Sequence, residues 1–322
     1  MEAEINKVAQ VGAGYMGGGI AQSLADSGFQ VWLADVDSDA TRAAHERLLA
    51  EAERFEAQGL FTPGSTERIR ANLHVAASIE EAVADVDFVE EAVPEVPGIK
   101  RDVLARVEAA AKPGTIIGTN TSTIPVHVLA EGMEDASRFL TVHWSNPAPF
   151  IPGVEIVAGD RTDRSIIPVV ERMLARAGRR SAQVADVPGF VLNRLQYVLL
   201  KEAMSIVEEG VATATDIDTI VTSTFGFRLP FFGPFAIADM AGLDVYANGF
   251  TTLEGAFGER LAAPKVLTDL VAQGRFGIKS GSGFLELEPE KREELIAYRN
   301  KAYSAMGALL RELGPSPLAD PS

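Results

Sequence analysis

The stretch Val8-Ala9-Gln10-Val11-Gly12-Ala13-Gly14-Tyr15-Met16-Gly17 predicts the fold of the first part of this chain. A short apolar strand ends in three glycines spaced as GxGxxG, and the apolar residues that follow indicate a helix. Gly12 permits a tight turn, Gly14 lets the backbone approach a pyrophosphate, and Gly17 allows the helix to pack closely on the strand. The stretch therefore predicts a strand–turn–helix unit that binds a dinucleotide at the N-terminus of its helix.

A second apolar strand, Val31–Ala34, ends at Asp35, about 20 residues beyond the glycine turn, as the dinucleotide motif requires. A carboxylate at this point accepts hydrogen bonds from the adenosine ribose hydroxyls and repels a 2′-phosphate. The sequence thus predicts NAD rather than NADP as the cofactor. The alternative is a glycine-rich turn without a ligand, and the position of Asp35 argues against it.

Predicted strands and helices alternate through the first half of the chain, which indicates an α/β fold with a doubly wound, mostly parallel sheet of the Rossmann type. After Asp186-Val187-Pro188-Gly189 the pattern becomes helical. We therefore expect an NAD-binding domain over residues 1–187 and an all-helical domain over residues 188–322. The strands are expected at residues 6–11, 30–34, 88–91, 115–119, 139–143, 154–158 and 182–187, and the longer early helices at 38–58, 99–111 and 164–177.

Composition excludes several classes of protein. The chain of 322 residues has no cysteine, so neither a disulfide nor a thiolate metal site can form. Its net charge of −16 disfavours nucleic acid and anionic membranes as partners. The segment Met1–Glu4 is acidic rather than basic, and no apolar run is long enough to span a bilayer, so a soluble, cytoplasmic protein is expected. No cluster of His, Asp and Glu has metal-ligand spacing, so no metal is expected.

The segment His143-Trp144-Ser145-Asn146-Pro147, with Glu155 downstream, supplies a base and a partner for that base. A histidine can take a proton from an alcohol, and a carboxylate on its other ring nitrogen fixes the tautomer and stabilises the imidazolium. Taken alone, the segment also fits a histidine at a strand end and a glutamate in a solvated turn.

Ordered motifs along nearly the whole chain resemble the 3-hydroxyacyl-CoA dehydrogenases. That family has a nucleotide-binding domain and a helical domain that forms much of a homodimer interface, with the active site in the cleft between the domains. The matching pieces are the glycine turn, Glu95 with Lys100, Asn120-Thr121-Ser122, His143 with Asn146 and Glu155, Pro188–Arg194, and Gly277–Phe284.

The resemblance implies a role for each matching residue. His143 would remove the proton from a substrate 3-hydroxyl while hydride leaves for NAD, and Glu155 would orient His143. Ser122 and Asn193 would hold the substrate oxygen, and Asn146 would bind near the nicotinamide. An ordinary exposed ion pair is the alternative reading of Glu95 and Lys100. The residues expected to contact the cofactor are Gly12, Gly14, Tyr15, Met16, Gly17, Asp35, Glu95, Lys100, Asn120, Ser122 and Asn146.

Arg228 bears on the choice of substrate. An arginine among apolar residues favours a carboxylate, and its segment resembles relatives that oxidise free hydroxy acids such as gulonate or carnitine. The segment Gly277–Phe284 instead resembles the acyl-CoA enzymes of fatty acid metabolism.

Three hypotheses about function stay open. The first is an NAD-dependent dehydrogenase of a short free 3-hydroxy acid, with Arg228 binding the substrate, and the second is an L-3-hydroxyacyl-CoA (3-hydroxybutyryl-CoA) dehydrogenase. The third is a non-catalytic nucleotide-binding protein, because the gulonate branch resembles a lens structural protein.

Overall fold

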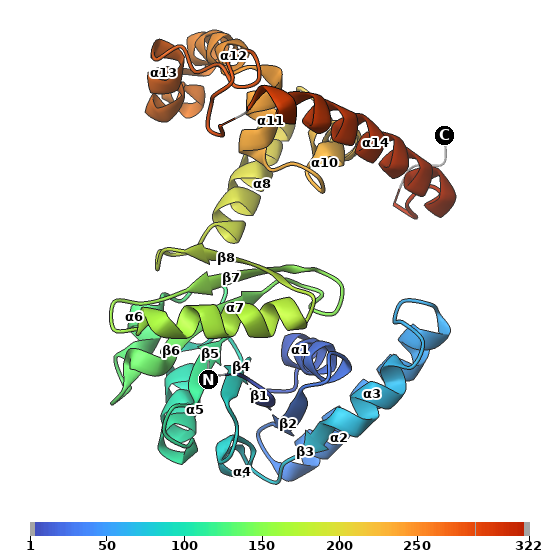
Figure 1. Cartoon of the computed structure of the whole chain (residues 1–322), viewed down its shortest axis with the longest axis vertical. Coiled ribbons are helices and arrows are strands. Elements are labelled where there is room, and N and C mark those ends of the chain that lie inside the picture. Colours follow the sequence, from blue (N-terminus) through green and yellow to red (C-terminus); the bar gives the residue numbers. More distant parts are fainter. Residues whose placement is uncertain (1–3, 287, 319–322) are drawn as a thin grey trace. The chain divides into compact units, whose positions relative to one another are not determined.

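A computed structural model describes residues 4–286 and 288–318 of the chain. Contacts divide the chain into two compact units, Met1–Leu200 and Lys201–Ser322, which we call the first and second units. Figure 1 shows the sheet of the first unit and the helices of the second. The division falls inside a helix, Leu192–Glu208 (α8), whereas the sequence places the boundary at Pro188-Gly189, which stays a prediction.

The first unit is built on an eight-stranded sheet in the order β3-β2-β1-β4-β5-β6-β7-β8 (Figure 1). All neighbouring strands are parallel except β6 and β7, which are antiparallel. The predicted Rossmann-type, mostly parallel sheet is therefore confirmed. The strands are Lys7–Val11 (β1), Gln30–Ala34 (β2), Leu73–Val75 (β3), Phe88–Glu91 (β4), Ile116–Thr119 (β5), Phe139–Trp144 (β6), Gly153–Val157 (β7) and Arg180–Val184 (β8).

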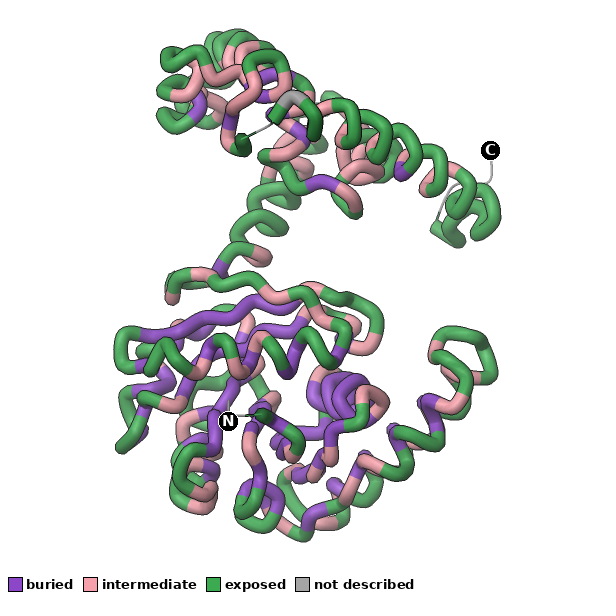
Figure 2. Tube along the Cα trace, in the orientation of Figure 1, coloured by how far each residue is buried: buried purple, intermediate pink, exposed green. Residues whose placement is uncertain are grey.

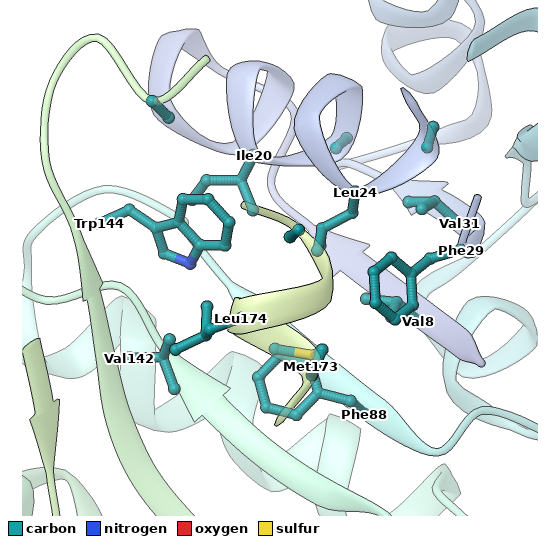
Figure 3. Close-up of a cluster of buried hydrophobic side chains, with 14 of the residues drawn as sticks. Val8, Ile20, Leu24, Phe29, Val31, Phe88, Val142, Trp144, Met173 and Leu174 are labelled. Carbon is teal, nitrogen blue, oxygen red and sulfur yellow. The ribbon is translucent and has the colours of Figure 1, made fainter. Parts of the chain in front are cut away.

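Helices cover both faces of this sheet because alternate strand residues point to opposite faces. Val8 belongs to the buried cluster shared with the first and seventh helices, and its neighbour Ala9 belongs to the cluster on the opposite face. Figure 3 shows Leu24 and Leu174 from those two helices within the first cluster. The helices of the first unit are Tyr15–Asp26 (α1), Ser38–Ala57 (α2), Ser65–Asn72 (α3), Ile79–Val83 (α4), Pro97–Ala110 (α5), Val126–Ala130 (α6) and Ile167–Arg176 (α7), with 3₁₀ turns at Ala136–Arg138 (η1) and Arg164–Ile166 (η2).

The last strand departs from its prediction. It was expected at residues 182–187, but β8 runs from Arg180 to Val184 and pairs with β7, with Gly153 opposite Arg180. This strand lies at the edge of the sheet and its residues are exposed or half-buried, so its own sequence carries little apolar pattern. The prediction placed the strand too late because the apolar residues Ala185 and Val187 alternate with Asp186 after Val184.

The second unit is helical, as predicted. Its Gly277–Phe284 loop is held to α11 by Asp239, whose buried carboxylate accepts hydrogen bonds from the backbone N–H groups of Phe284 (3.0 Å) and Leu285 (2.8 Å). Figure 2 shows that much of α8 and α14 is exposed. No helix in the described ranges is both long and apolar enough for a membrane span. The elements are Ala214–Ser223 (α9), Phe225–Arg228 (α10), Pro234–Ala241 (α11), Leu243–Phe257 (α12), Gly258–Leu261 (η3), Lys265–Ala272 (α13) and Pro289–Leu313 (α14).

Candidate active site

The turn after β1 admits only glycine at two of its three glycine positions. Gly12 has a φ of +89°, and a Cβ there would lie 2.8 Å from the backbone of Ala92. A Cβ on Gly17 would lie 1.9 Å from the carbonyl oxygen of Gly12, far inside contact distance. Gly14 caps α1 and has nothing within 4 Å of the position of a Cβ, which leaves open space at the start of the helix. This open space suits a phosphate approaching the free N–H groups of α1.

The carboxylate of Asp35 is fixed beside that turn. Its Oδ2 accepts a hydrogen bond from the backbone N–H of Ala13 (2.8 Å), and Oδ1 accepts one from Val36 (2.7 Å). Asp35, Gly12 and Gly14 line a cavity of about 580 Å³, within the range of small-molecule sites. The turn, the anion-binding helix end and the carboxylate together fit the adenosine half of NAD. Of the two residues that open α1, Tyr15 is exposed and Met16 is half-buried.

The antiparallel pairing of β6 with β7 places His143 directly opposite Glu155. His143 Nδ1 lies 2.8 Å from Glu155 Oε2, and both residues are buried. Oε1 of the same carboxylate accepts hydrogen bonds from the backbone N–H groups of Val191 and Leu192, each at 2.9 Å. The alternative reading of Glu155, a solvated turn residue, is therefore wrong.

The hydrogen bonds to Glu155 keep it ionised. Burial opposes ionisation, but the hydrogen bond from His143 and those from Leu192 and Val191 outweigh it, so the pKa of Glu155 lies below its ordinary value. An ionised carboxylate at Nδ1 favours the tautomer with its proton on Nδ1, which leaves the lone pair of Nε2 free to accept a proton.

Ser122 faces that second ring nitrogen. Its Oγ lies 3.2 Å from His143 Nε2, and Nδ2 of Asn193 donates to the carbonyl oxygen of Ser122 at 2.9 Å. Ser122 follows β5, and Asn193 lies in the first turn of α8. The four predicted catalytic residues, His143, Glu155, Ser122 and Asn193, are thus linked through hydrogen bonds within the first unit.

Lys100 is buried, contrary to the reading of an exposed surface ion pair. Its Nζ lies 2.9 and 3.2 Å from the two carboxylate oxygens of Glu91 and 3.5 Å from Glu95 Oε2. Glu91 also accepts a hydrogen bond from the Oγ1 of Thr119 at 2.6 Å. The sequence motifs did not include Glu91, because its link to Lys100 forms only when the chain folds.

Glu95 anchors the segment that carries Ser122. Its Oε1 accepts hydrogen bonds from the Oγ1 of Thr121 (2.7 Å) and from the backbone N–H groups of Ser122 (2.8 Å) and Thr123 (3.1 Å). Partial burial opposes ionisation, but these bonds and Lys100 lower the pKa of Glu95 below its ordinary value. Glu95 therefore positions Ser122 beside His143.

The two predicted asparagines differ in their surroundings. The Oδ1 of Asn120 accepts a hydrogen bond from the backbone N–H of Trp144 at 2.9 Å, so Asn120 ties the end of β5 to the end of β6. Asn146 is exposed and precedes a cis peptide bond to Pro147. Contact of either residue with the cofactor stays a prediction.

Arg228 is the one predicted site residue of the second unit. It ends α10 and is half-buried at a cavity of about 310 Å³. The cavity is also lined by Ile237 and Met240 of α11 and by Arg299 and Tyr303 of α14. Throughout residues 4–286 and 288–318, no three His, Asp or Glu side chains are grouped to hold a metal ion.

Comparison with known proteins shows which family the sequence matches. The sequence model of the 3-hydroxyacyl-CoA dehydrogenase NAD-binding domain matches residues 7–187, and that of the C-terminal domain matches residues 189–287. The chain is 34% identical over 307 residues to 5-formyl-3-hydroxy-2-methylpyridine 4-carboxylate 5-dehydrogenase of Mesorhizobium japonicum, which covers 95% of this chain and 98% of that protein.

Two further relatives show the range of substrates among similar proteins. L-carnitine dehydrogenase of Streptomyces coelicolor is 35% identical over 303 residues, which cover 91% of this chain and 93% of that enzyme. The crystal structure of a 3-hydroxyacyl-CoA dehydrogenase from Archaeoglobus fulgidus is similar with a TM-score of 0.78 and 33% identity, covering 94% of this chain and 99% of that chain.

Proposed function

Because the chain belongs to the 3-hydroxyacyl-CoA dehydrogenase family, we propose that this NAD-dependent oxidoreductase acts on the 3-hydroxyl group of a short free 3-hydroxy acid. The observation that carries the choice of a free acid is Arg228, half-buried at a cavity that no acidic residue lines among residues 4–286 and 288–318. L-3-hydroxyacyl-CoA dehydrogenase is the second candidate.

His143 acts as the base in this proposal. With its Nδ1 proton held by Glu155, Nε2 takes the proton of the substrate hydroxyl, and the ionised carboxylate stabilises the imidazolium that results. NAD, when bound, accepts the hydride from the carbon that carries this hydroxyl. Catalysis then depends on the short, buried contact between the two side chains, since it fixes both the tautomer and the ring orientation.

Ser122 and Asn193 position the substrate. The Ser122 hydroxyl already lies at hydrogen-bond distance from Nε2, so a substrate hydroxyl bound beside it lies close to the base. Asn193 holds the Ser122 backbone, and its amide polarises the substrate oxygen as the carbonyl forms. Neither side chain can serve as a base, so their loss should reduce the rate less than loss of His143 does.

The cofactor residues support a preference for NAD over NADP. The carboxylate of Asp35 accepts only backbone hydrogen bonds, and it lines the cavity at the glycine turn. The negative charge of Asp35 repels a 2′-phosphate placed there, whereas the carboxylate oxygens accept hydrogen bonds from ribose hydroxyls.

Two observations favour a free acid over a CoA thioester. A carboxylate satisfies the guanidinium of Arg228, whereas a thioester is neutral. The arginines of the segment from Gly59 to Asn72 are also already neutralised: Arg68 pairs with Asp26, and Arg70 pairs with Glu53. Arg68 and Arg70 therefore have little free positive charge with which to bind the phosphates of CoA. One relative, 5-formyl-3-hydroxy-2-methylpyridine 4-carboxylate 5-dehydrogenase, has a carboxylate in the name of its substrate.

Steady-state kinetics on both kinds of substrate test the proposal. We expect turnover of free 3-hydroxy acids and a KM that rises at least ~10-fold in Arg228→Met, because a bidentate, partly desolvated ion pair is lost. The dissociation constant of NAD should not change. Efficient turnover of 3-hydroxybutyryl-CoA, no activity on free acids and a tolerated Arg228→Met would instead support the acyl-CoA candidate.

We further propose a homodimer that associates through the second unit and through α8, which carries exposed apolar residues such as Leu195, Val198 and Met204. A cytoplasmic location stays a prediction from the sequence.

A further inference from the structure

The cavity beside Arg228 contains a second guanidinium that the sequence motifs do not include. Arg299 of α14 lines it together with Arg228, and both side chains are half-buried. The helix α14 spans residues 289–313, beyond residues 189–287 that match the C-terminal domain of the family. The second arginine therefore comes from a part of this chain that the family model does not cover.

Neither arginine is paired with a carboxylate in the part of the chain that the structure describes. Arg299 donates Nε and Nη2 only to the neutral amide oxygen of Asn300, at 3.1 and 2.9 Å, and no ion pair involves Arg228. Two other arginines of this unit are neutralised: Arg260 pairs with two glutamates at 2.7 Å each, and Arg275 pairs with Glu286 at 2.7 Å. Two unpaired, half-buried cations are unexpected in a chain with a net charge of −16.

The size and the remaining lining of the cavity limit the ligand. At about 310 Å³ it lies at the small end of ligand sites. Ile237, Met240 and Ala241 give the same cavity apolar lining beside the two arginines. A short aliphatic chain that ends in one anionic group fits these features, because the chain covers apolar surface while the guanidinium forks bind the anion.

We infer that Arg299 joins Arg228 in binding the carboxylate of the substrate, so that α14 determines specificity for short hydroxy acids. The inference rests on the proposed function, since it assigns the ligand of the same cavity. Arg299 hydrogen-bonds only its neighbour in α14, so replacing it removes no tertiary hydrogen bond that the structure shows.

The test is a ligand-observed NMR titration of the full-length, NAD-saturated protein with butyrate, which lacks the hydroxyl and cannot be oxidised. We expect Arg299→Met to raise the dissociation constant of butyrate at least ~10-fold, as expected for loss of a charge-assisted bidentate contact. The matched control is Arg311→Met, which removes an exposed arginine of the same helix and should change it less than ~2-fold. Butyramide, the neutral analogue, should bind wild type at least ~10-fold more weakly than butyrate.

Three results would overturn the inference: equal butyrate affinity in wild type and Arg299→Met, equal weakening by Arg311→Met, or tighter binding of inorganic phosphate than of butyrate, which would indicate a phosphate site. If Arg299→Met is not obtained folded, Arg299→Lys keeps the charge and loses the bidentate fork, and should still weaken butyrate binding several-fold.

Loss of butyrate binding in Arg299→Met, together with a wild type inactive on free acids, supports the carboxylate site and refutes the proposed function. Active wild type with unchanged butyrate affinity and KM in Arg299→Met refutes the inference alone.

Discussion

The imidazole of His143 depends on its two neighbours for its chemistry, Glu155 on Nδ1 and Ser122 beside Nε2. Substituting His143→Gln keeps a polar side chain but removes the base. We expect kcat to fall ~10²–10⁴-fold, with the dissociation constant of NAD unchanged. His127→Gln is the control, because His127 is exposed and pairs with Asp186. Near-normal kcat in His143→Gln would remove His143 from the mechanism.

A buried glutamate outside the catalytic group also bears on stability. Glu90 of β4 is fully buried, lies opposite Gln10 in the sheet, and neither of its carboxylate oxygens has a hydrogen-bond partner among the described residues. Burial, and secondarily the negative charge of Glu91, raises the pKa of Glu90 well above its ordinary value, although Lys100 opposes the shift.

The raised pKa fixes the sign of a pH effect. The unfolded chain releases the Glu90 proton near its ordinary pKa while the folded protein retains it, so stability is lost as the pH rises between the two pKa values. Glu90→Gln removes this loss. In urea titrations, its gain in unfolding free energy should increase with pH by up to about 1.4 kcal/mol per unit within that window. A gain that is constant with pH, or equal to that of the exposed control Glu46→Gln, would contradict this account.

Sequence motifs identify residues whose roles depend on local spacing, and miss those whose partners arrive through folding. Gly12, Gly17 and Asp35 follow from the glycine turn, and the structure places them together. Glu91 becomes a site residue only because α5 packs over β4 and buries Lys100 against it. No spacing rule links an acid at a strand end to a lysine nine positions later in a helix.

Among the elements, β7 shows where the pattern of the sequence is insufficient. Short apolar runs predict strands, but they do not give strand direction. Only the fold shows that β7 turns back antiparallel to β6, and this reversal is what brings Glu155 into register with His143. The resemblance to a family predicted that Glu155 orients His143, but it did not predict the antiparallel pairing that brings the two residues together.

The link between β2 and the glycine turn gives a prediction about cofactor choice. Asp35 directly follows β2, and its carboxylate accepts a hydrogen bond from the backbone N–H of Ala13. Asp35→Ala should weaken NAD binding, because the ribose hydroxyls lose the carboxylate that accepts their hydrogen bonds. It should also narrow the preference for NAD over NADP, because the negative charge that repels the 2′-phosphate is removed. Fluorescence titration with both cofactors measures this. The control is Asp39→Ala, an exposed acid in the first turn of α2. If wild type binds NADP as well as NAD, the role of Asp35 is wrong.

At the scale of the whole molecule, the chain divides its tasks between its two units. The proposed base His143, Glu155 and the glycine turn belong to the first unit, whereas Arg228 and Arg299 belong to the second. The change from an alternating to a helical pattern predicted the two domains and their classes. The contribution of α14 could not be predicted, because helical periodicity does not show which cavity a polar side chain will line.

This division predicts how variants combine. Glu155 is proposed to act through His143 in proton transfer, whereas Arg228 is proposed to bind the carboxylate of the substrate. Separate sites with no shared partner add in free energy within about 0.5 kcal/mol. The kcat/KM of the double variant Glu155→Gln, Arg228→Met on a free 3-hydroxy acid should therefore fall by the product of the two single losses, within about threefold. The experiment is a double-mutant cycle at saturating NAD. A double variant no slower than the worse single variant would show instead that both residues support one step, with Arg228 aligning the substrate hydroxyl on His143 rather than only holding the acid.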